Sequence, residues 1–276
     1  MNAFYLFFYH PKLKDLLLEE IKLKHPELHL SFSNKEFVSM KGPKDYEAQL
    51  VSRPVVFARR QATFIDKYIQ APIEGEYATV GENQFWHFET IKTPIDTFSL
   101  EESDICEEEV PARAYHKACQ AFRLFDEVIT ANDQVVEIGS APGGISYYVL
   151  EKGAKLVSVD PALMSPLIES KFGEQFSHIK KSVFDVTRAQ LPKHCDWLIS
   201  DLNLNGDLNT NQSRRIMDFY ENIKGAFLTI KTPVINDLKK VDEWIKVFTD
   251  DKKYEVSVCH LPSHRREIGM FIRPRK

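Results

Sequence analysis

Residues 135–144 read VVEIGSAPGG, in which an apolar strand runs into a turn of glycine, serine and proline. A turn of this kind, where a strand gives way to a helix, lets backbone N–H groups approach a ligand with no side chain in between. The segment VSVDPA follows and places Asp160 at the end of the next predicted strand, where a carboxylate can bind ribose hydroxyls. Together the two segments predict a site for a nucleotide-like cofactor.

The turn departs from the fingerprint of dinucleotide-binding proteins. GSAPGG places Pro142 where the GxGxxG pattern needs a flexible residue, and the sequence lacks the motif that binds a pyrophosphate. We therefore interpret the pocket as one for S-adenosylmethionine (SAM) and not for a nicotinamide cofactor.

The length and composition are those of a globular protein with a sizeable core. The chain has 276 residues, of which 43% are hydrophobic, so one large or two smaller domains are possible. Its N-terminal apolar run, MNAFYLFFYH, is too short for a membrane span and lacks the basic flank of a signal peptide. We expect a cytoplasmic protein that does not enter the membrane.

The cysteines indicate neither disulfides nor a metal. Cys106, Cys119, Cys195 and Cys259 are scattered without a CxxC pair, as in reduced cytosolic proteins. His260 and His264 lie near Cys259, but Pro262 separates them, so the segment reads as a loop and no metal is predicted.

The net charge of −4 comes from one acidic stretch. Residues 85–110 hold one basic and eight acidic side chains, whereas the chain before them is balanced and the chain after them is slightly basic. SLEESDICEEEVP is therefore predicted to be a solvated linker, and neither flanking region need repel a phosphate backbone.

Residues 1–75 predict a small α+β domain. Its strands and helices alternate in the order β-α-β-β-α-β, which is the ferredoxin-like arrangement, with a possible role in RNA placement. Aromatic residues on its strands can stack bases in such domains, although buried core is the favoured interpretation; they are Phe4, Phe7, Tyr9 and Phe37. Residues 76–110 are predicted to form an extended acidic linker.

From residue 111 to 276 apolar strands alternate with helices, which predicts a doubly wound, Rossmann-like α/β sheet. Seven strands are expected: QVVEI, KLVSV, SHIKKS, DWLIS, AFLTI, YEVSVCH and EIGMFIRP. Ligands of such sheets gather at the carboxyl ends of the strands, so the polar residues there are site candidates. They are Asp160, Asp185, Asp201 and Lys231.

Lys231 is the most telling of these candidates, because FLTIKTP carries an apolar strand directly into a lysine. With Lys117 from the first helix and Glu267 from RREIGMF, the crevice would hold two ammonium groups and two carboxylates. This set suits methyl transfer to a ribose 2′-hydroxyl, where the enzyme aligns the oxygen and handles its proton. A second cation and burial lower the pKa of a lysine, whereas carboxylates raise it, and the sequence leaves the balance open.

The segments RAYHK, EIGSAPGG, SVDPA, SDLN, TIKTP and RREI occur in the order found in FtsJ-type ribose 2′-O-methyltransferases, which residues 111–276 resemble. The resemblance implies a catalytic tetrad of Lys117, Asp201, Lys231 and Glu267, with Lys231 as proton acceptor. It also implies that Asp160 binds the ribose of SAM and Asp185 its adenine amine, with Asp201 beside the cofactor. The methionine part would be lined by Gly139, Ser140, Pro142, Gly143 and Gly144.

Within that superfamily the chain most resembles the bacterial large-subunit ribosomal RNA cytidine 2′-O-methyltransferases (RlmM), through VVFARRQ, EEEVPARAYHKACQAF and KTP. The expected partner is therefore RNA, in particular large-subunit ribosomal RNA, and not DNA. The chain departs from that family because it has too few residues between its two parts for a THUMP domain. Methylation of another RNA, such as transfer RNA, and non-catalytic binding of SAM or RNA remain alternatives. The oligomeric state is not predicted.

Overall fold

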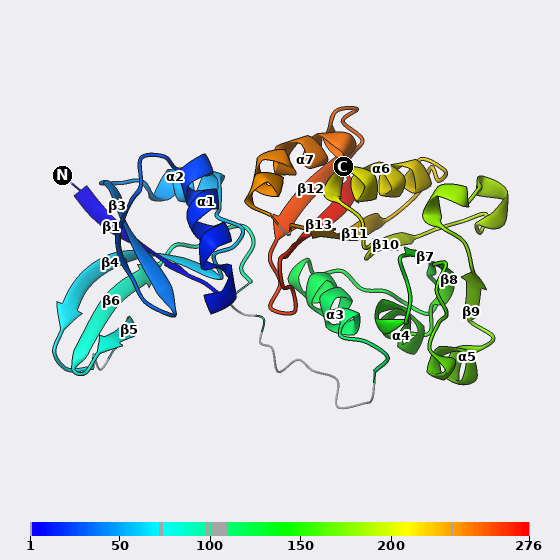
Figure 1. Cartoon of the computed structure of the whole chain (residues 1–276), viewed down its shortest axis with the longest axis horizontal. Coiled ribbons are helices and arrows are strands. Elements are labelled where there is room, and N and C mark those ends of the chain that lie inside the picture. The colour runs from blue at the N-terminus through cyan, green and yellow to red at the C-terminus, as the bar shows by residue number, and fades with distance from the viewer. Residues whose placement is uncertain (1, 72–73, 98–99, 101–109, 233, 276) are drawn as a thin grey trace. The chain divides into compact units, whose positions relative to one another are not determined.

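The computed structural model of the protein describes residues 2–71, 74–97, 100, 110–232 and 234–275. The chain divides into two compact units, residues 1–99 and 100–276, and each is described by itself (Figure 1). The predicted acidic linker falls largely on residues 101–109, which lie outside the described residues, as does Cys106.

The first unit is one antiparallel sheet with two helices on the same face (Figure 1). Its strand order is β2-β3-β1-β4-β6-β5, in which every neighbouring pair is antiparallel. Its elements are β1 (Asn2–Phe8), η1 (Pro11–Leu13), α1 (Lys14–Lys24), β2 (His29–Ser33), β3 (Phe37–Pro43), α2 (Glu47–Ser52), β4 (Arg60–Tyr68), β5 (Glu76–Gly81) and β6 (Gln84–Thr90).

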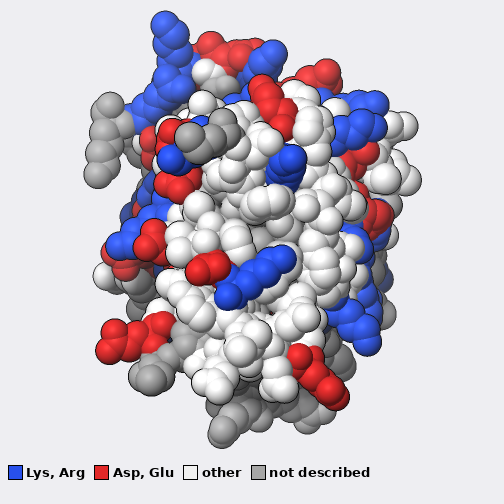
Figure 2. All heavy atoms as spheres, turned by 90° about the vertical axis from the view of Figure 1, so that its left-hand side faces the viewer, with Lys and Arg blue, Asp and Glu red and all other residues white. Residues whose placement is uncertain are grey.

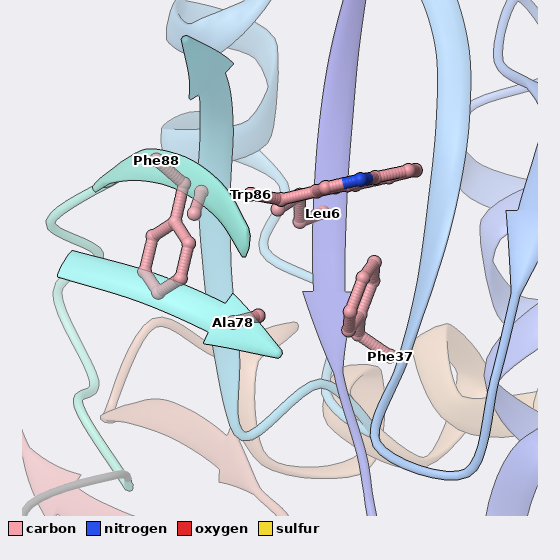
Figure 3. Packing of buried hydrophobic residues seen from close by; sticks show 6 residues of the cluster. Leu6, Phe37, Ala78, Trp86 and Phe88 are labelled. Atoms are coloured by element: carbon pink, nitrogen blue, oxygen red, sulfur yellow. The ribbon is translucent and has the colours of Figure 1, made fainter. Parts of the chain in front are cut away.

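Strand β1 is apolar on both faces, which explains its unbroken hydrophobic sequence. Tyr5 points to the helix side, where its hydroxyl accepts a hydrogen bond from the backbone N–H of Tyr46 at 2.9 Å. Because neighbouring residues of a strand face opposite ways, Leu6 lies on the other face. There it packs in an aromatic cluster with Phe37, Trp86 and Phe88 (Figure 3). The first sheet therefore has a second apolar layer, which we call the open face because α1 and α2 do not cover it.

The first unit extends beyond the predicted boundary at residue 75. Residues 76–90, expected to belong to the linker, form the β5–β6 hairpin, and β6 pairs with β4 from Ala62 opposite Thr90 to Tyr68 opposite Phe85. The hairpin forms because Trp86 and Phe88 bury their rings in the open face. The boundary between the units instead falls between residues 99 and 100.

The aromatic residues singled out in the first unit are mostly core. Phe7, Tyr9 and Phe37 are buried, which confirms the favoured interpretation for these three. Phe4 alone is half-buried.

The second unit has a sheet with the strand order β12-β13-β11-β10-β7-β8-β9. Strands β11, β10, β7, β8 and β9 are parallel, and β13 runs antiparallel to both β11 and β12. Its strands are β7 (Gln134–Ile138), β8 (Lys155–Val159), β9 (Phe176–Ile179), β10 (Trp197–Ser200), β11 (Gly225–Lys231), β12 (Tyr254–Cys259) and β13 (Glu267–Pro274). Its helices are α3 (Ala114–Leu124), α4 (Gly144–Glu151), α5 (Pro166–Phe172), η2 (Val183–Asp185), η3 (Arg188–Gln190), α6 (Gly206–Met217), η4 (Ile235–Lys240) and α7 (Val241–Thr249).

Helix α6 begins at Gly206. The side chain of Asn205 caps it by accepting a hydrogen bond from the backbone N–H of Leu208 at 2.9 Å. The helix ends at Met217, and a loop leads from there into β11. No helix among the described residues is long and apolar enough to cross a membrane.

We predict that Leu6→Ala lowers the free energy of unfolding by about 2–5 kcal/mol, the usual cost of removing a fully buried leucine side chain. Leu6 has no exposed surface. Chemical denaturation of the full chain measures the change. Leu30→Ala is the matched control, because Leu30 is 53% exposed and its truncation should change the free energy by less than about 0.5 kcal/mol. Equal effects of the two substitutions would show that the open face is not a packed layer.

Candidate active site

Most of the predicted site residues lie near the carboxyl ends of β7 and β10, which are neighbouring strands. The backbone N–H of Asp201, just after β10, donates to the carbonyl oxygen of Ile138 at the end of β7 at 3.1 Å. The glycine-rich turn and Asp201 are thus neighbours at the carboxyl edge of the sheet, between β8 on one side and β10 on the other. Ligands of doubly wound sheets bind at this edge.

The four charged residues of the predicted tetrad meet in one cluster, which we call the ion quartet. Nζ of Lys117 lies 3.0 Å from both carboxylate oxygens of Asp201 and 3.0 Å from Oε2 of Glu267. Nζ of Lys231 lies 2.5 Å from Oε1 of Glu267 and 3.5 Å from Oδ1 of Asp201. Each ammonium group therefore contacts both carboxylates.

Sheet register explains half of the ion quartet. Lys231 is the last residue of β11, and Glu267, the first residue of β13, is its direct partner across the antiparallel pair. Opposite residues of such a pair point to the same face and approach closely, so the salt bridge follows from the pairing itself. Lys117 reaches the same point from α3, and Asp201 from the end of β10.

The two lysines differ in their access to solvent. The side chain of Lys117 is 4% exposed, whereas that of Lys231 is 26% exposed. Burial pushes the pKa of Lys231 down, but the charges of Asp201 and Glu267 outweigh burial, so this pKa is raised above its ordinary value. Burial acts in the opposite sense on Glu267, and the two lysines overcome it and lower the pKa of that carboxyl. The balance that the sequence left open is thus decided in favour of the charged forms.

The glycine-rich turn requires its glycines. Gly139 has φ = +76°, and a β-carbon there would lie 2.8 Å from the backbone of Leu202. Gly143 has φ = +114° and caps α4 without any side-chain hydrogen bond. A β-carbon on Gly144 would lie 2.6 Å from the carbonyl oxygen of Ala112. The turn is packed closely, and the first N–H groups of α4 have no capping side chain.

The other predicted cofactor residues occupy different environments. Ser140 is buried and donates to the sulfur of Met164 at 3.5 Å, whereas Pro142 is exposed. Asp160 lies beside the turn, since its carboxylate accepts hydrogen bonds from the backbone N–H groups of Ala141 at 3.1 Å and Ala162 at 2.8 Å. The hydrogen bond from Ala141, which holds the turn against Asp160, was not predicted from the sequence.

Asp185 stands apart from these residues. It ends η2 and its side chain is exposed. Within the described residues no hydrogen bond or ion pair joins it to the glycine-rich turn or to the ion quartet.

Glu137 is a buried polar residue beneath the turn that the sequence analysis missed. It lies in β7, where Ser146 donates to its carboxyl group at 2.5 Å and Ser158 at 3.5 Å. Burial raises the pKa of Glu137 to about 8, against the lowering effect of the Ser146 hydrogen bond. A carboxyl group in the middle of the apolar run VVEIG was the available signal, because a buried carboxyl group needs such partners.

The loop before Glu267 is held by hydrogen bonds. Nε2 of His260 lies 3.0 Å from the carbonyl oxygen of Arg265, and Nδ1 of His264 accepts from the N–H of Leu261 at 3.2 Å. The loop is tied to α3 because the N–H of Ser263 donates to Gln120 at 3.0 Å. In the described part of the chain no three His, Cys, Asp or Glu residues are grouped to hold a metal ion.

We predict that Glu267→Gln lowers the pKa of Lys231, because it neutralises one of the two carboxylates that raise this pKa. NMR titration of ¹³C-labelled lysine side chains measures the shift, with Lys231→Arg to assign the signal. Lys224 is the internal control, since its pKa is raised by Asp133 and Asp196 and should not change. An unmoved midpoint for Lys231 would show that Glu267 does not hold the proton there.

Comparisons with known proteins cover the same region. The profile of the FtsJ-like methyltransferase family matches residues 110–247, half of the chain, which include three members of the ion quartet but not Glu267.

Two curated relatives are called ribosomal RNA large subunit methyltransferase M. That of Histophilus somni is 25% identical over 184 residues, which cover 60% of this chain and 48% of the relative. That of Colwellia psychrerythraea is 26% identical, covering 59% and 46%. The chain therefore spans about half the length of these relatives.

Among solved structures, the fibrillarin pre-rRNA processing protein of Methanococcus jannaschii is 11% identical with a TM-score of 0.41, covering 78% of this chain and 88% of that one. On the strength of the family profile, which matches half of its residues, the chain belongs to the FtsJ-like methyltransferase family.

Proposed function

We propose that the protein transfers the methyl group of SAM to a ribose 2′-hydroxyl of RNA, in particular large-subunit ribosomal RNA. The observation that carries the proposal is the ion quartet, in which two ammonium groups and two carboxylates meet at the carboxyl edge of the sheet beside the glycine-rich turn. Membership of the FtsJ-like methyltransferase family supports it.

Lys231 is the residue suited to accept the proton of the hydroxyl. It is the more exposed of the two lysines, whereas the buried Lys117 holds the two carboxylates in place. Its raised pKa means that Lys231 must first lose a proton to solvent. Bound SAM supplies an electrophilic methyl group. Nζ of Lys231, once deprotonated, would accept the proton of the ribose hydroxyl that takes up this methyl group.

The turn suits the methionine part of SAM. The first N–H groups of α4 lack a capping side chain, and helix N-termini favour carboxylates. The surrounding atoms leave no room for a side chain at Gly139, Gly143 or Gly144. Ser140 and Pro142 are the other residues of the turn that we assign to this part of SAM. Each carboxylate oxygen of Asp160 accepts one backbone hydrogen bond and keeps a second lone pair for a ribose hydroxyl. Asp185 remains our candidate for the adenine amine.

The choice of RNA rests on the relatives. Their printed name is that of a large-subunit ribosomal RNA methyltransferase. The family profile, which matches residues 110–247, includes Lys117, Asp201 and Lys231. The first four strands of the N-terminal unit follow the β-α-β-β-α-β order, which supports its assignment as a ferredoxin-like unit that places RNA. Transfer RNA is the alternative substrate. A cytoplasmic location stays a prediction from the cysteine pattern.

We predict that Lys231→Ala slows methyl transfer to RNA by about 10²- to 10⁴-fold, the usual contribution of a general base. Binding of SAM should be nearly unchanged. Transfer of isotopically labelled methyl groups into total RNA from a strain that lacks the protein measures the rate, and mapping of 2′-O-methyl groups identifies the ribose. The wild-type rate should rise with pH from neutral to alkaline values, because the raised pKa keeps Lys231 protonated.

Lys240→Ala is the matched control for this experiment, because Lys240 is a surface residue paired with Asp207. Its rate should equal that of the wild type. A normal rate for Lys231→Ala would remove this residue as the proton acceptor. Absence of methyl transfer by the wild type, despite SAM binding, would favour a non-catalytic binding protein.

We predict that Asp160→Ala weakens SAM binding by roughly 10- to 100-fold, the expected effect of losing hydrogen bonds to a charged group. Calorimetric titration with SAM measures it. Asp218→Ala is the control, since Asp218 pairs with Arg214 at the end of α6. Unchanged affinity for SAM in Asp160→Ala would exclude the carboxylate from the cofactor site.

A further inference from the structure

The open face of the first unit contains a cavity of about 120 Å³. The ion quartet belongs to the other unit. Five strands contribute to its lining: Phe4 from β1, Ser31 from β2, Ser39 from β3, Phe64 and Lys67 from β4, and Trp86 from β6.

Small side chains and strand irregularities keep the cavity open. The pairing of β2 with β3 shifts between Leu30 and Phe32, and that of β4 with β6 shifts between Phe64 and Asp66. Such bulges bend a strand and redirect its side chains. Ser31, at the first shift, and Ser39 leave space that the aromatic rings around them do not fill.

Three aromatic rings form the walls at steep angles to one another. The centroids of Phe4 and Phe64 are 6.2 Å apart with an interplanar angle of 85°, and those of Phe64 and Trp86 are 5.4 Å apart at 70°. Phe4 and Phe64 are half-buried, and Trp86 is 9% exposed, so the rings remain accessible in part. A flat aromatic ligand would find a ring face to stack on, with serine hydroxyls able to bond its polar edge.

The charge beside the cavity is positive. Nζ of Lys67 lies 4.8 Å from the centroid of Trp86, and Lys41 is the direct partner of Phe4 across the β1–β3 pair, so it lies on the same face. Both lysines are exposed, and neither has a carboxylate within salt-bridge distance among the described residues. Figure 2 shows a wide, mostly uncharged area on one side of the molecule, in which basic side chains stand and an acidic side chain touches one of them.

We propose that this cavity binds one base of single-stranded RNA, with Lys41 and Lys67 contacting the neighbouring phosphates. RNA as the ligand rests on the proposed function. An apolar cavity of ~150 Å³ holds a benzene ring. This cavity is smaller, about 120 Å³, but it opens to solvent, so part of a base can enter and a pyrimidine fits better than a purine. Stacking on aromatic side chains together with lysine contacts to phosphates is the usual chemistry of single-strand binding. A base in a duplex stays stacked and cannot enter.

The test uses the full chain and a ten-residue oligouridylate. Binding should quench the fluorescence of Trp86, while Trp197 and Trp244, which are buried in the second unit, should not respond. Trp86→Phe keeps a ring in the cavity, so it should bind the oligonucleotide with no change in fluorescence. Oligoadenylate and a duplex should bind more weakly than oligouridylate.

The variants separate stacking from charge. Phe64→Leu should weaken binding by roughly tenfold, within the range for one stacked base. Lys41→Ala combined with Lys67→Ala should flatten the salt dependence of log affinity by roughly one unit of slope or more. Tyr77→Leu and Lys22→Ala are the controls, since Tyr77 is exposed and lies on the other face from Ala78 and Trp86, and Lys22 is exposed on α1. Neither control should change the affinity.

Two results would overturn the proposal. They are an absence of Trp86 quenching, and equal losses of affinity in the cavity variants and the controls. Binding of oligouridylate to Lys231→Ala distinguishes failure of the cavity proposal from failure of the proposed function. If this variant and the wild type both bind oligouridylate in the cavity but the wild type methylates no RNA, the cavity is confirmed and the methyltransferase proposal fails. If RNA is methylated and the cavity variants bind as the wild type does, the cavity proposal alone fails.

Discussion

Charge balance among four buried or half-buried side chains is the constraint on which the second unit depends. Lys117 and Glu267 are almost fully enclosed, and each is neutralised by its neighbours in the ion quartet. An ion left without its partner in such a place is strongly destabilising, since the cost of removing it from water is no longer offset. The four charges stay paired only if α3 remains packed at the end of β10 and the β11–β13 register is kept. The same requirement keeps the four groups within bonding distance.

The ion quartet, on whose charge balance the second unit depends, also favours the protonated form of Lys231. The carboxylates raise the pKa of Lys231 although burial lowers it, so a base at this position is obtained only after a proton leaves. In the proposed function, an RNA strand that covers Lys231 would bury it further, which favours the neutral amine, whereas the phosphates of the strand would favour the charged form. Activation of the base would then depend on which of these two effects of the substrate is larger. The 26% of the Lys231 side chain that remains exposed is the surface that a substrate can cover.

The sequence predicts those features that depend on local pattern. Apolar runs that end in polar residues predict strand β7 with its glycine-rich turn, Asp201 after β10 and Lys231 at the end of β11. Asp160 illustrates what a pattern leaves out. The sequence predicts its position after β8, but its hydrogen bonds to the N–H groups of Ala141 and Ala162 depend on how two loops pack against each other. The direction of the shift in the pKa of Lys231 likewise depends on distances, which residue order does not contain.

The first unit shows why a sequence can hide a surface within a core. Both faces of β1 are apolar, so Phe4, Leu6 and Phe8 have the same character in the sequence, yet Leu6 is fully enclosed whereas Phe4 lines a cavity. The difference arises from the bulges in β2 and β4 and from Trp86, which reaches the open face from a hairpin that the sequence analysis assigned to a linker. A bulge leaves one residue unpaired and disrupts the ladder locally, and bulges are over-represented at sheet edges and beside functional sites. Here it leaves aromatic rings and serine hydroxyls around a space next to two lysines without acidic partners among the described residues, and simple packing does not require that combination.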